Sequence, residues 1–301
     1  MKFTKATRKK ARLRLALTGP SGSGKTLGAL MIAKGLGGKW AVLDTERGSA
    51  SLYAQPVALR GGGTFQSPDF DALELAPPFS PERFIEAIHA AEAAGYSGLL
   101  IDSATHEWSG SGGCLEINDE LAKSKFRGNS WSAWNETTPR NRDFIDAMLQ
   151  SNMHIIATGR SKTETAQSEE NGRKKVVKLG MKTEQRDGFE YEFTVVLDLT
   201  HDGHYATASK DRTGLFIGDP KPISEDTGAA LLAWLEEGET EPDVKAILRG
   251  IENSATLEIL KSSFEAAMQM LPKAHWPSII AAKDKRKVAL SEGEEDGGGN
   301  G

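Results

Sequence analysis

The chain has 301 residues, of which 38% are hydrophobic and 26% are charged, a balance that is ordinary for a globular protein. No uninterrupted apolar run approaches the roughly 20 residues that a membrane-spanning helix needs, so we expect no membrane partner and a cytoplasmic location. The net charge of -5 excludes a general attraction to nucleic acid, and the single cysteine, Cys114, excludes an intrachain disulfide framework.

Short apolar runs alternate with helical segments in the first part of the chain. We expect strands at residues 13–18, 40–44, 71–75, 99–102 and 153–158. Helices are expected at 27–36, from 80 onward, at 115–126 and at 134–149, where Pro139 predicts a break. Residues 160–175 are strongly charged and predict a polar loop, and further strands are expected at 176–179, 192–199 and 205–210. This order predicts an α/β fold, a mostly parallel sheet flanked by helices with an antiparallel extension.

Composition divides the rest of the chain into smaller parts. Residues 1–12 are basic and predict an N-terminal arm, whereas residues 13–238 carry the strand and helix pattern of the main domain. Residues 239–290 begin with a linker and contain two amphipathic helices, which is enough for a small C-terminal helical module. Residues 291–301 are acidic and rich in glycine and contain no apolar side chain, so we expect them to be disordered.

The most specific motif lies between the first strand and the first helix. Residues 19–26 fit G-x-x-x-x-G-K-[ST], the phosphate-binding P-loop, at every defined position. Its glycines let backbone N–H groups converge on phosphate oxygens, and the positive end of the next helix adds to this cradle. We expect Lys25 to reach the β- and γ-phosphates of ATP and the Thr26 hydroxyl to bind Mg²⁺. The expected phosphate-binding residues are Gly19, Pro20, Ser21, Gly22, Ser23, Gly24, Lys25 and Thr26.

Carboxylates follow two of the expected strands. Asp102 comes directly after the apolar residues 99–101, where a P-loop protein needs a carboxylate to hold Mg²⁺ through water. A helix cap is the structural alternative for this residue. Hydrolysis also needs a group that activates the attacking water, and two carboxylates are candidates. Glu46 lies just past the strand that ends at Asp44, and Glu107 lies shortly after Asp102.

Three segments together resemble the ATPase core of the RecA/RadA recombinase superfamily: the P-loop, Asp44-Thr45-Glu46 and Leu100-Ile101-Asp102-Ser103-Ala104-Thr105. Over roughly residues 10–218 the chain is most similar to phage-encoded RecA-like ATPases that assist single-strand annealing. The resemblance implies a RecA-like core, ATP and Mg²⁺ as ligands, and Glu46 as the water-activating residue. It also places γ-phosphate recognition at Thr158, Gly159 and Arg160. Because the family commonly has an amide side chain there, the sensing residue stays open.

The resemblance further implies an active site shared between subunits. Residues 209–214 are similar to the Lys-x-Arg segment of RadA- and DnaB-like members, so Lys210 and Arg212 would reach phosphates bound by a neighbouring subunit. This arrangement requires a homo-oligomer built head-to-tail, as a ring or a filament. A basic hairpin turn is the alternative for this segment.

Single-stranded DNA is the partner that the resemblance implies, and two polar loops after core strands would contact it. Lysine and arginine neutralise phosphates, and aromatic side chains stack on unpaired bases. Trp131 could instead anchor the helix that follows it. A single-strand-binding or annealing protein is a further expected partner, and a phage-encoded protein would act in the host cytoplasm. The first loop offers Trp108, Lys123, Lys125, Phe126, Arg127 and Trp131, and the second offers Arg160, Lys162, Arg173, Lys174 and Lys175.

The leading hypothesis is therefore a Mg²⁺-dependent ATPase that binds single-stranded DNA and acts in recombination or single-strand annealing. A small-molecule P-loop kinase of the nucleoside or nucleotide type is the alternative. Residues 160–175 could be mistaken for the lid of such a kinase, but Asp44-Thr45-Glu46 and the late strands fit it poorly. A transporter-type ATPase fits poorly, because its signature segment precedes the metal-binding carboxylate, whereas the similar residues 109–113 follow Asp102.

Overall fold

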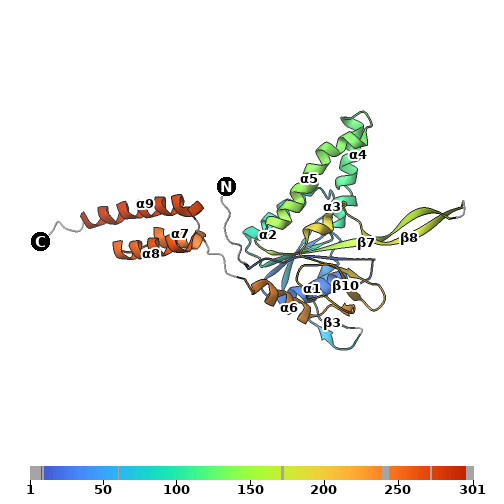
Figure 1. The fold of residues 1–301 in the computed structure, drawn as a ribbon, viewed down its shortest axis with the longest axis horizontal. Coiled ribbons are helices and arrows are strands. Elements are labelled where there is room, and N and C mark those ends of the chain that lie inside the picture. The colour runs from blue at the N-terminus through green and yellow to red at the C-terminus, as the bar shows by residue number, and fades with distance from the viewer. Residues whose placement is uncertain are drawn as a thin grey trace. The chain divides into compact units, whose positions relative to one another are not determined.

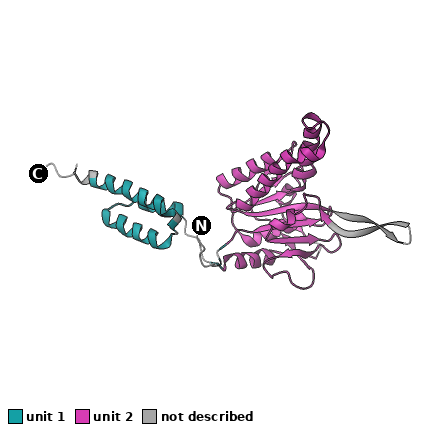
Figure 2. Cartoon of the chain, turned by 45° about the horizontal axis from the view of Figure 1, so that its top comes forward, with its two compact units in different colours: residues 1–10, 238–301 teal, residues 11–237 magenta. Residues whose placement is uncertain are grey.

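The computed structural model describes residues 8, 10–59, 61–170, 173–238, 244–271 and 273–295. The chain divides into two compact units, one comprising residues 11–237 and the other residues 1–10 and 238–301 (Figure 2). The larger unit contains the P-loop and a central sheet. The smaller unit contains helices only in its described part, and each unit is considered by itself below.

Within the described residues, the central sheet has nine strands in the order β11-β10-β9-β1-β7-β6-β2-β5, with β8 paired to β7 (Figure 1). The run from β9 to β5 is parallel, whereas β10, β11 and β8 pair antiparallel. This confirms the predicted fold class. The strands are β1 (Arg14–Gly19), β2 (Trp40–Asp44), β5 (Phe70–Glu74), β6 (Gly98–Asp102), β7 (His154–Glu170), β8 (Arg173–Thr183), β9 (Val195–Leu199), β10 (Tyr205–Asp211) and β11 (Lys221–Pro222). A separate small sheet pairs β3 (Val57–Ala58) with β4 (Thr64–Phe65).

Helices cover both faces of this sheet (Figure 1). On one face α1 (Lys25–Leu36) packs against α6 (Glu225–Glu236), and on the other α2 (Pro81–Ala93) packs against α5 (Ser130–Gln150). Side chains alternate between the two faces along a strand, so Leu15 and Leu17 join the core beneath α1 while Ala16 joins the core beneath α2 and α5. Both faces of the strands are buried, which explains why the core strands read as nearly continuous apolar runs.

Two expectations for this unit were wrong. Residues 160–175 are not a loop, because β7 continues past the edge of the sheet and pairs with β8 as an antiparallel ribbon. A ribbon that extends beyond the sheet needs no apolar face, so a polar composition does not prevent it. Pro139 does not break its helix, since α5 is continuous through it. Pro139 has no N–H to donate to the Asn135 carbonyl one turn earlier. Both residues are exposed, so water can solvate that carbonyl instead.

The larger unit also has short elements that the sequence did not reveal. They are α3 (Thr105–Ser109), η1 (Ala50–Tyr53) and η2 (Phe189–Glu192), the last replacing the start of the strand expected at 192–199. The helix α4 (Cys114–Ser124) packs on α5 close to its predicted position. The α4–α5 pair rises from one side of the sheet (Figure 1).

The smaller unit contains α7 (Val244–Glu252), α8 (Leu257–Met270), η3 (Lys273–His275) and α9 (Trp276–Glu295). Its core is formed by side chains such as Ile251, Leu260 and Ile279. The helix α9 extends through Glu295, which corrects the prediction that disorder begins at residue 291. The rest of that tail, and the linker expected at 239–242, lie outside the described residues.

In the part of the chain that the structure describes, no helix is both long enough and apolar enough to cross a bilayer.

Candidate active site

The P-loop joins β1 to α1 at the carboxyl edge of the sheet. Gly22 and Gly24 have φ values of 76° and 88°, which strain any residue with a Cβ, so glycine is required at both turns. The half-buried Lys25 side chain folds back over the loop, and its Nζ donates hydrogen bonds to the carbonyl oxygens of Gly19 (3.1 Å) and Pro20 (2.9 Å). These contacts hold a cation directly above the loop, at the place where a phosphate would enter.

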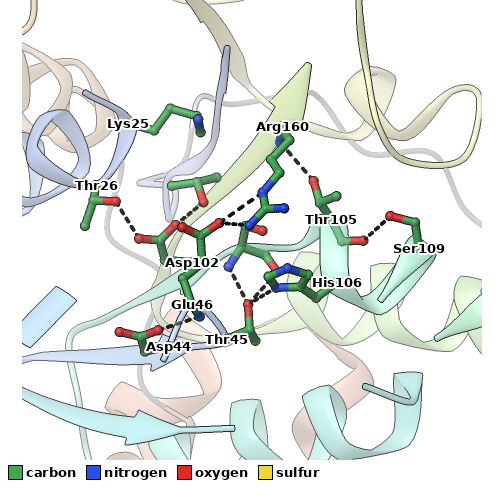
Figure 3. A network of polar contacts seen from close by, with 12 residues as sticks. Lys25, Thr26, Asp44, Thr45, Glu46, Asp102, Thr105, His106, Ser109 and Arg160 are labelled. Carbon is green, nitrogen blue, oxygen red and sulfur yellow. Dashed lines mark hydrogen bonds and ion pairs between the residues drawn. The ribbon is translucent and has the colours of Figure 1, made fainter. Parts of the chain in front are cut away.

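Asp102 ends β6 next to β2 and β7, and its carboxylate is enclosed by two hydroxyl groups. Thr26 Oγ1 donates to Asp102 Oδ2 at 2.6 Å (Figure 3). Thr158 Oγ1 donates to Asp102 Oδ1 at 2.5 Å. The side chain is 1% exposed, and burial raises the pKa of Asp102 even though both hydrogen bonds favour its charged form. Asp102 therefore lies in contact with Thr26, the residue that follows Lys25.

Glu46 lies in a tight turn that Asp44 organises. Asp44 Oδ1 accepts a hydrogen bond from the Glu46 N–H (2.6 Å), and Asp44 Oδ2 accepts one from the Ala50 N–H (2.9 Å). The Glu46 carboxylate forms an ion pair with Arg160, with distances of 3.2 Å to Nε and 2.8 Å to Nη2 (Figure 3). Burial lowers the pKa of Lys25, while the charges of Asp102 and Glu46 oppose that shift, so the three charges influence one another.

The segment expected to sense the γ-phosphate lies on β7 beside this group. Thr158 contacts Asp102, and Arg160 contacts Glu46 through its side chain. The Arg160 backbone N–H donates to Thr105 Oγ1 at 2.9 Å, which fixes this part of β7 to the start of α3. Among the described ion pairs at this edge of the sheet, Arg160 is the cation that pairs with Glu46.

Glu107, the other candidate for water activation, lies in the protein interior. Its side chain is 0% exposed, and it accepts hydrogen bonds from Cys114 Sγ (3.1 Å), from Asn141 Nδ2 (3.2 and 3.3 Å) and from Gln185 Nε2 (3.1 Å). Burial raises its pKa to about 7. A carboxylate with no exposed surface cannot contact an attacking water, so the structure removes Glu107 from the candidates for this role.

A family model described as an AAA domain matches residues 11–220, which is most of the chain. The chain belongs to this family of P-loop ATPases. No significant match was found among curated proteins. The protein is therefore a nucleotide-binding ATPase, and the match spans every residue of the site described above.

This ATPase also places two histidines at its site that the sequence pattern did not single out. His106 Nδ1 lies 2.6 Å from Thr45 Oγ1, so α3 touches the turn that carries Glu46. His204 Nδ1 lies 3.0 Å from the Ser23 carbonyl oxygen, which means that this nitrogen carries the proton. The hairpin between β9 and β10 thus packs over the P-loop. A turn sequence predicts a hairpin, but it contains no signal for what the hairpin covers.

Lys210 and Arg212 lie at the opposite edge of the sheet from the P-loop. In β10, Lys210 pairs with Val196 near the amino end of β9, and β9 runs parallel to β1. The P-loop follows the carboxyl end of β1, so neither residue lines the site of its own chain. Lys210 Nζ donates to the backbone carbonyls of Glu190 (3.4 Å) and Tyr191, whereas the Arg212 side chain is exposed.

The residues expected to contact DNA fall on two separate projections of the domain (Figure 1). One group lies at the end of α4 and in the connection to α5, where Lys125 forms an ion pair with Glu136. The other group lies in the first part of β8, where only the backbone is described. The first group comprises Lys123, Lys125, Phe126 and Arg127, and the second comprises Arg173, Lys174 and Lys175.

Proposed function

We propose that this ATPase is a Mg²⁺-dependent, RecA-like protein that acts on single-stranded DNA in recombination or single-strand annealing. The observation that carries the ATPase chemistry is the meeting of Thr26, Asp102 and Glu46 at one edge of a parallel sheet, with Lys25 and Arg160 beside them. The proposed action on single-stranded DNA rests on the resemblance of residues 10–218 to RecA-like ATPases. Residues that bind phosphate, hold a metal and activate water are the parts that phosphoryl transfer to water needs.

The donor set at Asp102 fits a hard divalent cation. Thr26 Oγ1 and the Asp102 carboxylate are both oxygen ligands, and they already lie 2.6 Å apart. Burial raises the pKa of Asp102, and a cation at this place would stabilise the charged carboxylate. When bound, Mg²⁺ would neutralise charge on the transferring phosphoryl group. The P-loop N–H groups and Lys25 would orient the β- and γ-phosphates.

Glu46 is the residue that we assign to water activation, and Arg160 controls its availability. In the ion pair of 2.8 Å the Glu46 carboxylate is occupied by the guanidinium group. An incoming γ-phosphate offers Arg160 a stronger anionic partner, because arginine forms charge-assisted contacts with phosphate. Glu46 can then accept a proton from the attacking water, while Arg160 senses the γ-phosphate in place of the amide side chain that RecA-like proteins commonly have.

A neighbouring subunit would complete the site with Lys210 and Arg212. The exposed Arg212 supports this proposal, because it lies away from the nucleotide edge of its own chain. A cation supplied to the phosphates in trans typically raises the hydrolysis rate about 10³–10⁵-fold. The assembly would then be head-to-tail, as a ring or a filament.

Two measurements test the function. The first compares phosphate release from ATP with and without single-stranded DNA, together with DNA binding by the wild-type protein. We expect binding and a change in rate. Absence of both, with phosphate passed instead to a nucleoside, would establish the kinase alternative.

The second measurement mixes Arg212→Ala with Glu46→Gln. Each variant alone should bind ATP and hydrolyse it slowly. In the mixture, some interfaces combine an intact Glu46 with an intact Arg212, so activity should partly return. Mixed samples that are no more active than the separate ones would contradict a shared site.

A further inference from the structure

A groove lined by tryptophan runs beside α5 on the larger unit. Its volume is about 480 Å³, and its floor and walls come from α3, from the first half of α5 and from the segment after β8. Both charged side chains among its described lining residues are arginines. The lining residues are Trp108, Trp131, Trp134, Asn135, Thr138, Pro139, Arg142 and Arg186.

The tryptophans form a stacking surface. The rings of Trp108 and Trp134 are parallel to within 20°, with centroids 5.5 Å apart, and the Arg186 guanidinium lies 5.8 Å from the Trp134 ring. Trp131 precedes Trp134 by one helical turn and is 87% exposed. A tryptophan that anchors a helix in a core would be buried, so Trp131 does not have that structural role.

We propose that this groove binds the unpaired bases of single-stranded nucleic acid. Exposed aromatic rings offer every base a stacking partner, and arginines along the same groove offer partners to the phosphates. The combination matches an anionic, aromatic polymer better than an apolar peptide, for which two arginines would have no counterpart. The inference rests on the proposed function and names the surface through which that function would contact its DNA.

The groove is held in shape from beneath by Glu107. Two residues that donate hydrogen bonds to the Glu107 carboxylate are sequence neighbours of residues that line the groove. Asn141 precedes Arg142, Gln185 precedes Arg186, and Glu107 itself precedes Trp108. One buried carboxylate therefore fixes α3, α5 and the segment after β8 relative to one another. A preformed groove binds without first losing conformational entropy.

The same helix α3 connects the groove to the nucleotide edge. Thr105 accepts the Arg160 N–H, His106 contacts Thr45 beside Glu46, and Trp108 lies in the groove. Because α3 has only five residues, a displacement at one end moves the other. This contact supplies a physical route by which a base in the groove can alter the position of Glu46.

The test measures the affinity of a labelled oligothymidylate for the full chain by fluorescence anisotropy, with the wild type, Trp131→Ala and Arg142→Ala. We expect Trp131→Ala to raise Kd by about 5- to 150-fold, the loss of one stacked base. Arg142→Ala should reduce the slope of log Kd against log salt by about 0.7, the loss of one phosphate contact on a single strand. Both side chains are exposed, so both variants should fold, which circular dichroism verifies.

Tyr191→Ala serves as the matched control, because Tyr191 is an aromatic residue with 76% exposure outside the groove. It should bind DNA as the wild type does. An oligouridylate arm separates DNA from RNA, and a duplex arm should bind more weakly because pairing hides the faces of the bases.

The possible outcomes separate the two proposals. No DNA binding by the wild type would overturn the proposed function itself. Wild-type binding that Trp131→Ala and Arg142→Ala leave unchanged would overturn only the groove. A change in oligomeric state with Trp131→Ala, measured by light scattering and without loss of DNA affinity, would instead show a contact between protein chains and would also overturn the groove.

Discussion

Asp102 and Glu107 are buried carboxylates near the end of β6, and burial raises the pKa of both, but the regions around them differ. Asp102 is bound by the hydroxyls of Thr26 and Thr158 at the open edge beside the P-loop. Glu107 is enclosed by two amides and a thiol that belong to three different segments. The first region can exchange its partners for a metal and phosphates, whereas the second joins elements together. A raised pKa alone therefore does not identify the catalytic carboxylate.

The largest effect is expected at the nucleotide edge with Lys25→Ala. Removing this cation takes away a contact to the phosphates in the ground state and in the transition state, so ATP hydrolysis should fall at least about 10³-fold. Steady-state phosphate release measures the loss. Lys39→Ala is the control, because Lys39 is exposed, pairs with Asp71 and precedes the amino end of β2, at the opposite edge of the sheet from the P-loop. Normal turnover by Lys25→Ala would contradict the assignment of the phosphate site.

The two candidates for water activation can be separated by the same substitution at each. Glu46→Gln keeps the shape of the side chain but cannot accept a proton, so kcat should fall about 10²–10⁴-fold with ATP binding retained. Glu107→Gln should change kcat less than about tenfold, since its side chain does not reach the nucleotide. An equal loss in both variants would remove the distinction between the two regions.

Glu107→Gln should also change how stability depends on pH. The folded protein raises the pKa of Glu107 from 4.5 to about 7, so between these values the folded state binds more protons than the unfolded state. The free energy of unfolding should therefore decrease by about 3 kcal/mol as the pH rises from 4.5 to 7, through this group alone. Glutamine does not titrate, so the variant should lack this contribution.

Urea unfolding of the wild type and Glu107→Gln at pH 5 and pH 8 measures that difference. The stability of the wild type relative to the variant should be lower at pH 8 than at pH 5. A difference that is independent of pH would show that the Glu107 carboxylate is ionised in the fold throughout this range.

The smallest effect on stability is expected for an exposed ion pair between the end of α4 and α5. Lys125 on the α4–α5 connection pairs with Glu136, and the two side chains are 61% and 39% exposed. Lys125→Ala should reduce the free energy of unfolding by about 0.2–1 kcal/mol, because water screens such pairs. Urea unfolding is again the measurement. A decrease in the free energy of unfolding of about 3 kcal/mol, as large as the pH-dependent contribution of Glu107, would mean that water screens the ion pair far less than its exposure indicates.

The sequence was sufficient where a local pattern determines the structure. The P-loop is contiguous, and Asp102 and Glu46 follow strands whose carboxyl ends meet at one edge of a parallel sheet, so their proximity could be expected. Those strands were also predicted closely, because they are buried on both faces and therefore uniformly apolar.

Other features depend on residues that only the fold brings together. The groove joins Trp108, Trp131 and Arg186, which lie far apart in the sequence, and no local pattern connects them. Strands were expected at 153–158 and 176–179, but the continuation of β7 through residues 160–170 and its pairing with β8 have no apolar alternation to predict them. The helix α3 is too short to give a helical period. Pro139 predicted a break, but the packing of α5 against α2 and α4 maintains the helix through it.

The direction of β10 has a consequence for stoichiometry. Because β10 runs antiparallel to β9, one chain presents its P-loop at one edge of the sheet and Arg212 at the other. In an assembly that uses Arg212 against a neighbour's phosphates, each subunit with two neighbours both donates an arginine and receives one. A closed ring then contains as many complete sites as subunits, whereas an open filament always contains one fewer. Short filaments would therefore show a lower activity per subunit than long ones, and the activity per subunit would report the length of the assembly.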